Sequence, residues 1–307
     1  MACALAHVIF LLYLCAMKNL RLVISIIILL FASILAIKAD PFLLPGSHRF
    51  SYPCNGFFKG QTLDVFFYVP QGVEIQDMKV QFVMHGTNRN ASRYRDAWIS
   101  LADQYHLIII APQFDKDRFP SEKYQQGNVK VAWDQYNEEA LIYGIIDDLF
   151  CALNQKYHFK DTKYNIFGHS AGAQFVHRFV LFYSSPYLDK AVAANAGTYT
   201  LLTNKANYPF GYRDIGGVSQ ISKDIFSKQL IVLLGDGDTI RDANLNISSA
   251  ADKQGLNRWQ RGHNFFISAQ QYANKRKCSF NWQLDTVPNV AHSASQMSIH
   301  AADLLYK

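Results

Sequence analysis

Short apolar runs that alternate with helical stretches are the feature of this sequence that most constrains its fold. The run LIIIAP at 107–112 is continuous and β-branched, which is typical of a strand buried on both faces. Similar runs lie at 63–70, 79–86, 163–168, 190–197, 229–235 and 280–287. Helical patterns occupy about 92–105, 137–157, 171–183, 261–275 and 293–306. This alternation predicts an α/β fold, with a mostly parallel sheet and helices on both of its faces.

Only two stretches of the chain after residue 39 fall outside this alternation. Residues 40–60 are rich in Pro, Gly and aromatic side chains, so we expect an irregular segment before one domain that spans 61–307. Residues 198–228 are rich in Tyr, Asn, Pro and Gly. About thirty residues can form a lid or loop but not a second domain with its own core. We therefore expect a short lid insertion at about 198–228.

The first 39 residues contain three basic residues and no acidic one. The apolar run LVISIIILLFASILAI at 22–37 follows a basic stretch that begins at Met17, which is the layout of a secretory signal peptide. We expect Met17 to be the true start, and cleavage to fall between Ala39 and Asp40. The protein would then be secreted or periplasmic. The alternative is an uncleaved membrane anchor, because the run is near the lower limit for a spanning helix.

Charge and cysteine content exclude several classes of protein. Removing 39 of the 307 residues leaves 268 and lowers the formal net charge from +6 to +3. No basic cluster is interleaved with aromatic residues, so we expect no nucleic acid partner. The cysteines that follow residue 39 are Cys54, Cys151 and Cys278, which allow three pairings among which the sequence does not choose. None of them has zinc-ligand spacing, so we expect no metal site.

The segment NIFGHSAGAQF at 165–175 carries the main evidence on chemistry. It reads as a short strand, a Gly168-His169-Ser170-Ala171-Gly172 turn and a helix. This pattern fits the G-x-S-x-G nucleophile elbow, in which a strained turn presents a serine at the carboxyl edge of the sheet. Small residues at Gly168 and Gly172 let the neighbouring backbone close around the serine. Ser170 is therefore the predicted nucleophile.

A serine nucleophile requires a base and a carboxylate, which follow it in the chain on this type of scaffold. His292 comes directly after the last predicted strand, where a short loop can bring its imidazole back to the serine. Asp238 follows the run QLIVLLG and is the preferred acid, although Asp236 and Asp242 are also within reach of the strand end. The run DGDTIRD at 236–242 also resembles a calcium loop, but Ile240 stands where an oxygen ligand is needed.

Attack by the serine creates an oxyanion that needs preorganised N–H donors. We expect one donor to be the backbone of Ala171, the residue after the nucleophile at the start of a helix. The loop FVMHGTNRN at 82–90 follows an earlier strand and contains the small Gly86. We therefore assign the second donor to the backbone of Thr87.

These residues, in this order over 60–307, resemble the α/β-hydrolase fold. The stretches HGTNRNASRYRDAW (85–98), GHSAGAQFVHRF (168–179) and RWQRGHNFF (258–266) are similar to exported bacterial α/β-hydrolases related to polyhydroxybutyrate-depolymerase-like esterases. The resemblance implies an eight-stranded sheet, a Ser-His-Asp triad and no cofactor. Carried over by position, it assigns the triad to Ser170, Asp238 and His292, and the oxyanion hole to Thr87 and Ala171.

We therefore expect an exported serine hydrolase that cleaves carboxylic esters through an acyl-serine intermediate, with a small-molecule or oligomeric ester as its substrate. A serine peptidase or amidase with the same triad is one alternative, and a non-catalytic binding protein is another. The predicted insertion is short, so we expect a fairly open site. Aromatic candidates for the lining of that site are Trp133, Tyr136, Tyr208, Phe210 and Tyr212.

Overall fold

The computed structural model describes Met17 and residues 23–25, 40–130 and 136–307. The chain divides into two compact units, Met1–Leu44 and Pro45–Lys307. In the first unit a short 3-10 helix, Pro41–Leu43, begins after Asp40, whose carboxylate accepts a hydrogen bond from the N–H of Phe42. The predicted signal peptide at 1–39 lies outside the described residues, except for Met17 and 23–25. No helix in the described part of the chain is both long and apolar enough to cross a membrane.

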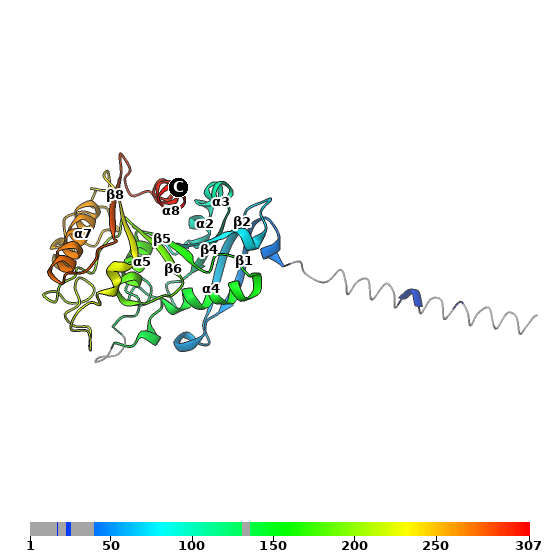
Figure 1. Cartoon of the computed structure of the whole chain (residues 1–307), viewed down its shortest axis with the longest axis horizontal. Helices are drawn as coiled ribbons and strands as arrows, with labels where there is room; N and C mark the ends of the chain where they lie inside the picture. The colour runs from blue at the N-terminus through cyan, green and yellow to red at the C-terminus, as the bar shows by residue number, and fades with distance from the viewer. Residues whose placement is uncertain (1–16, 18–22, 26–39, 131–135) are drawn as a thin grey trace, which may run out of the picture. The chain divides into compact units, whose positions relative to one another are not determined.

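An eight-stranded sheet forms the centre of the second unit, in the order β1-β2-β4-β3-β5-β6-β7-β8 (Figure 1). The strands are β1 (Gly46–Pro53), β2 (Thr62–Val69), β3 (Lys79–Met84), β4 (Leu107–Gln113), β5 (Tyr164–His169), β6 (Leu188–Ala194), β7 (Gln229–Gly235) and β8 (Gln283–Val287). The pairs β1–β2 and β2–β4 are antiparallel, and every other pair is parallel. The prediction of a mostly parallel sheet is confirmed.

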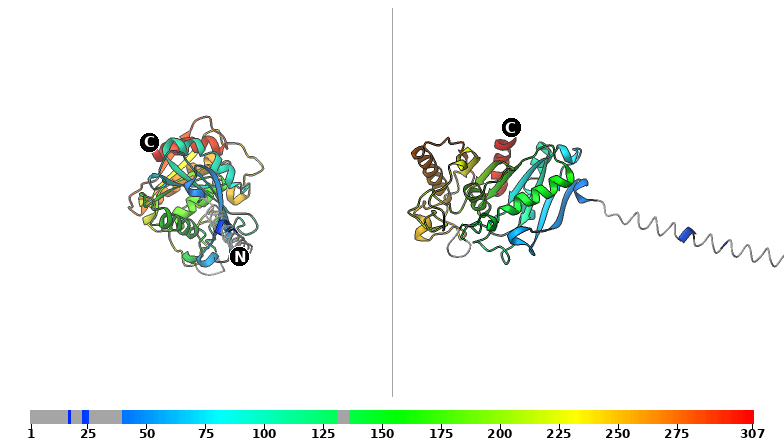
Figure 2. Two further views of the ribbon diagram at one scale, coloured as in Figure 1. Left: turned by 90° about the vertical axis from the view of Figure 1, so that its right-hand side faces the viewer. Right: turned by 60° about the horizontal axis from the view of Figure 1, so that its bottom comes forward.

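Helices cover both faces of the sheet. They are α2 (Ala91–Asp96), α3 (Ile99–Tyr105), α4 (Gly144–Tyr157), α5 (Ala171–Phe182), α6 (Ser249–Asp252), α7 (Arg258–Lys275) and α8 (Ala294–Tyr306). The helices α2, α3 and α8 share one core cluster with residues of the central strands. The helix α4 lies on the opposite side, as Figure 1 shows and the right-hand view of Figure 2 repeats with α4 in front of the strands.

The central strands are buried on both faces, which explains their continuous apolar sequences. Every residue of β5 is buried, and so are five of the six residues of β3. The strand β2 alternates between buried and partly exposed positions instead. Because β3 to β8 run parallel, their carboxyl ends meet at one edge of the sheet, where side chains from distant parts of the sequence come together.

The prediction of an irregular segment over 40–60 is wrong, because β1 occupies Gly46–Pro53. This strand pairs only with β2, in a register that joins Gly46 to Val69 and Pro53 to Thr62. A strand at the edge of a sheet needs no continuous apolar run, since one of its sides is free of a neighbouring strand. Because β1 contains Ser, His and Arg residues, it has no continuous apolar run by which the sequence would indicate a strand.

The helix predicted over 92–105 is two helices, which are separated at Ala97 and Trp98. The N–H of Trp98 donates to the carbonyl of Arg95, a tight turn that ends α2. This turn brings the Trp98 side chain, which is fully buried, against Phe167 of β5 with ring centroids 5.2 Å apart. The helix predicted over 137–157 also differs, because α4 begins only at Gly144.

The Trp98 side chain links the α2–α3 turn to the strand that leads to the predicted nucleophile. We expect Trp98→Ala to lower the free energy of unfolding by about 3–5 kcal/mol, because it leaves a cavity in the core. Urea unfolding followed by circular dichroism would measure the change. The matched control is Phe57→Ala, since Phe57 is 55% exposed and its loss should cost much less. Equal losses for the two variants would contradict the role given to Trp98.

Candidate active site

The turn between β5 and α5 has the geometry of a nucleophile elbow. Ser170 has a left-handed φ of 60° with ψ of −114°, a strained conformation for a residue with a side chain. A Cβ at Gly168 would collide with the backbone of Gly172, and a Cβ at Gly172 would collide with the carbonyl of Met84. Both positions must therefore be glycine for the turn to close. The Ser170 side chain lines a cavity at the carboxyl edge of the sheet.

His292 and Asp238 meet at this same edge. The Nδ1 atom of His292 lies 2.6 Å from Oδ2 of Asp238, a short charge-assisted hydrogen bond. The Asp238 side chain is 2% exposed, whereas that of His292 is 23% exposed and lines the cavity with Ser170. This contact fixes the tautomer with hydrogen on Nδ1, which leaves Nε2 free to accept a proton.

The two other candidate carboxylates have different partners. Asp236 accepts a hydrogen bond of 2.6 Å from the backbone N–H of Asn289, so it holds the loop before His292. Asp242 is held by Arg258, whose Nη1 lies 2.7 Å from Oδ2 of Asp242. Hydrogen bonds from Arg258 lower the pKa of Asp242 to about 2. Of the three candidates, Asp238 is the one in contact with His292.

Arg258 and Asn195 also hold the loops that carry Asp238 and His292, and sequence reasoning missed both. Nη1 of Arg258 lies 3.3 Å from Oδ1 of Asp238, and both side chains are buried. The fully buried Asn195 accepts a hydrogen bond from the N–H of Gly235 and donates one to the carbonyl of Ala291. These contacts fix the end of β7 and the loop before His292 relative to each other.

The loop predicted to hold the oxyanion is anchored from two sides to the backbone of Phe114. His85 accepts a hydrogen bond of 3.0 Å from the N–H of Phe114, and Arg89 donates one of 2.7 Å to its carbonyl. Thr87 lies between these anchors and lines the cavity with Ser170. The N–H of Thr87 donates to no backbone carbonyl among the described residues, and the N–H of Ala171, the first residue of α5, has no acceptor within that helix. Both are therefore candidate donors to a substrate.

His169, which we interpreted as a packing residue within the elbow, is buried but contacts the site directly. Its ring centroid lies 4.4 Å from that of His292, and its Nδ1 lies 3.3 Å from the hydroxyl of Tyr94. Burial lowers the pKa of His169 well below its usual range. The residue therefore packs as a neutral ring against one side of His292.

The cavity that contains Ser170 has a volume of about 360 Å³ and polar walls. Its lining residues are Gly86, Thr87, Asn88, Asn90, Arg93, Tyr94, Ala97, His169, Ser170, Asn244, His292, Ser293, Ala294 and Ser295. No residue of 198–228, all of which the structure describes, is among them, so the predicted lid is not confirmed. Trp133 lies outside the described residues, and the other four aromatic candidates do not line this cavity.

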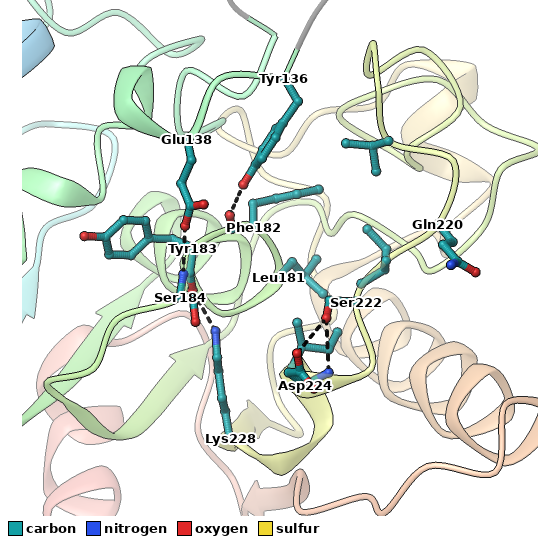
Figure 3. Close-up of a pocket in the computed structure, with 13 residues that line it drawn as sticks. Tyr136, Glu138, Leu181, Phe182, Tyr183, Ser184, Gln220, Ser222, Asp224 and Lys228 are labelled. Carbon is teal, nitrogen blue, oxygen red and sulfur yellow. Dashed lines mark hydrogen bonds between the residues drawn. The ribbon is translucent and has the colours of Figure 1, made fainter.

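Those four aromatic residues lie elsewhere in the structure. The Tyr136 hydroxyl donates to the carbonyl of Phe182 in a second cavity of about 260 Å³ (Figure 3). That cavity lies at the carboxyl end of α5, a helix of about 18 Å, whereas Ser170 precedes its amino end. The side chains of Tyr208 and Tyr212 are buried, and the backbone of Phe210 bonds to Leu201.

Cysteine pairing and metal binding were the other open questions. Cys54, Cys151 and Cys278 are all unpaired in the structure. Within residues 40–130 and 136–307 no group of three or more His, Cys, Asp or Glu side chains is arranged to hold a metal ion.

Two solved structures are similar to this chain over nearly its whole domain. The poly(3-hydroxybutyrate) depolymerase LpqC from Bordetella parapertussis is 30% identical with a TM-score of 0.80, over 86% of this chain and 90% of that one. The poly(aspartic acid) hydrolase-1 from Sphingomonas sp. KT-1 is 33% identical with a TM-score of 0.79, over 86% of this chain and 100% of that one. The chain belongs to the α/β-hydrolase superfamily and is a hydrolase.

More distant matches share the fold alone. The S-formylglutathione hydrolase from Agrobacterium tumefaciens is 12% identical with a TM-score of 0.54, over 84% of this chain and 92% of that one. No protein-family model matches the sequence, and no curated protein does.

Burial of His85 predicts a dependence of stability on pH. Desolvation lowers the pKa of this residue to about 3. Below about pH 6.5 the unfolded chain binds a proton at this position that the folded chain does not, so stability present above pH 6.5 falls as pH falls towards 3. We expect His85→Gln to lose less stability than the wild type between pH 6 and pH 5, by about 1 kcal/mol.

Urea unfolding at the two pH values would measure this difference. The control is His106→Asn, because His106 is exposed at the left-handed end of α3, a conformation that Asn also adopts. This variant should keep the wild-type pH dependence. The assignment fails if His85→Gln follows the wild-type pH dependence.

Proposed function

We propose that this hydrolase cleaves carboxylic esters through an acyl-enzyme formed on Ser170, with His292 as base and Asp238 as the acid that orients it. The observation that carries this proposal is the 2.6 Å contact between His292 and Asp238 beside a cavity that both His292 and Ser170 line. The strained backbone of Ser170 adds support, because strain of this kind concentrates at functional sites.

In the acylation step, Nε2 of His292 accepts the hydroxyl proton of Ser170 while its Oγ attacks the ester carbonyl carbon. The carbonyl π bond opens, and the negative charge collects on its oxygen. The N–H groups of Thr87 and Ala171 donate hydrogen bonds to this oxyanion. Asp238 stabilises the imidazolium form of His292 through Nδ1–H. The bond to the alcohol then breaks, and His292 gives the leaving oxygen its proton.

In the deacylation step, water takes the place of the alcohol. His292 accepts a proton from the water, and the hydroxide oxygen attacks the acyl carbon on Ser170. The negatively charged oxygen of this second intermediate accepts hydrogen bonds from the same two N–H groups. When it collapses, the bond to Oγ of Ser170 breaks and His292 returns the proton to that oxygen. A free carboxylic acid leaves, and the enzyme is restored with all atoms and protons balanced.

Ester cleavage is supported by one of the two similar structures, a poly(3-hydroxybutyrate) depolymerase. The other is named as a poly(aspartic acid) hydrolase. A cavity without a confirmed lid fits an oligomeric substrate, because only a short part of a long chain needs to enter it. We propose oligomeric esters as the preferred substrates. Cleavage of amides is the competing outcome, which the experiment below distinguishes.

Substitutions of the proposed nucleophile and acid test this mechanism. We expect Ser170→Ala to abolish labelling by a fluorophosphonate probe and turnover of 4-nitrophenyl esters. We expect Asp238→Asn to lower kcat/KM by roughly 10³-fold or more, because the imidazole loses its orientation and its counter-charge. Amino-acid 4-nitroanilides, assayed side by side, should be cleaved more slowly than the esters.

Asp236→Asn is the matched control for Asp238→Asn. It alters a carboxylate of the same loop that bonds to a backbone N–H rather than to His292, so its kcat/KM should fall far less. Unchanged labelling of Ser170→Ala would overturn the nucleophile, and a larger loss for Asp236→Asn would overturn the acid. Faster turnover of anilides than of esters would establish amide cleavage instead.

We also propose that the protein is exported, with cleavage between Ala39 and Asp40. Expression of the full chain in a Gram-negative host, followed by fractionation and mass spectrometry, should yield a 268-residue chain in the periplasm or medium. The control variant Ile27→Arg/Leu30→Arg interrupts the apolar run and should keep the protein in the cytoplasm. An uncleaved chain in the membrane fraction would establish an anchor instead.

A further inference from the structure

The walls of the Ser170 cavity carry an uneven distribution of charge. No Asp or Glu is among its lining residues, all of which the structure describes. Apart from the histidines, Arg93 is the one lining side chain that carries a charge at neutral pH, because the phenol of Tyr94 is neutral there. The remaining polar walls come mainly from amides and hydroxyls, those of Asn88, Asn90, Asn244, Ser293 and Ser295. A cavity of this composition favours a polar substrate with a negative charge.

Helical geometry directs Arg93 into the cavity. Arg93 lies three residues after Asn90, which precedes α2, and four residues before Ala97, which follows it, and all three line the cavity together with Tyr94. Their neighbour Arg95 lies on another side of the helix, where it donates to the carbonyl of Phe67. Of the two arginines in α2, only Arg93 therefore belongs to the wall of the active site.

Arg93 has no carboxylate partner within the part of the chain that the structure describes. The acid best placed to pair with it along the helix is Asp96, three residues on. However, Asp96 is bound by Arg95, whose Nε lies 2.7 Å from Oδ1 of Asp96. Two other arginines near the site are also paired, since Arg258 contacts Asp238 and Asp242, and Arg241 contacts Asp252. Arg93 is an exposed residue, so its guanidinium remains available to a ligand.

We propose that Arg93 is a specificity-determining residue, which binds a carboxylate of the substrate while Ser170 attacks the ester. The preferred substrates are then esters that carry a free carboxylate within reach of the α2 side chain, such as monoesters of dicarboxylic acids. A guanidinium binds a carboxylate through two parallel N–H···O contacts, which fix orientation as well as charge. This inference rests on the proposed ester hydrolysis at Ser170.

The test compares two pairs of 4-nitrophenyl esters that differ only in charge. Each pair consists of a hydrogen adipate or hydrogen suberate and its neutral methyl ester, with release of 4-nitrophenol as the readout. We expect the wild type to prefer the charged member in kcat/KM by about fivefold to tenfold, mainly through a lower KM. The preference should decrease with added NaCl, because exposed charges are screened.

Variants of Arg93 connect this preference to the residue. We expect Arg93→Gln to bring the ratio of kcat/KM for charged and neutral esters close to one, Arg93→Glu to bring it below one, and Arg93→Lys to retain part of it. The matched control is Arg49→Gln, which removes an exposed arginine from β1, outside the cavity. This control should keep the wild-type ratio.

The outcomes separate this inference from the proposed function. If the wild type and Arg93→Gln show the same ratio for both pairs, or if Arg49→Gln changes it equally, the role of Arg93 is wrong while ester hydrolysis stands. If Ser170→Ala releases nitrophenol at the wild-type rate, the proposed function itself is wrong.

Discussion

Contact between two segments of backbone, without side chains between them, is the constraint on which the rest of this site depends. The start of α5 packs so closely on the end of β3 that a Cβ at Gly172 would collide with the carbonyl of Met84. The same contact fixes the distance between the turn that carries Ser170 and the loop that carries Thr87. The proposed nucleophile and oxyanion donors are therefore held relative to each other by the fold, which is the preorganisation that such chemistry requires.

Buried polar side chains extend this rigidity to the acid and base loops. Arg258 is placed between Asp238 and Asp242, so the charge of the buried carboxylate is balanced on the side that faces away from His292. Removal of the arginine alone would leave an uncompensated buried charge, which is costly. Asn195 joins the same two loops through uncharged hydrogen bonds. The positions of the proposed acid and base are thus held by Arg258 and Asn195, neither of which lines the Ser170 cavity.

The sequence predicted the features of this protein that depend on residues close to one another in the chain. The elbow around Ser170 is a local motif, and the ends of apolar runs located Asp238 and His292 without knowledge of the pairing of strands. Contacts between distant segments were beyond such reasoning. Asn195 and Ala291 are 96 positions apart in the chain, and nothing local indicates that they meet.

The predicted aromatic lining residues show the same limit of sequence reasoning, because their contacts are with distant segments. Tyr208 and Tyr136 lie in or near a loop of unusual composition, which suggested a substrate-binding surface. Their hydroxyls instead donate to backbone carbonyls of other segments, that of Gln126 for Tyr208 and that of Phe182 for Tyr136. The sequence also did not indicate the break between α2 and α3. The burial of Trp98 against Phe167 is a tertiary contact, which overrides local helix propensity.

The three unpaired thiols bear on what holds this domain together. Cys54 is buried, Cys151 and Cys278 are partly exposed, and none is joined to another. Over residues 40–130 and 136–307 no disulfide links the segments of the domain, so packing, hydrogen bonds and ion pairs hold them together. The fold described here therefore requires no oxidation of these three thiols.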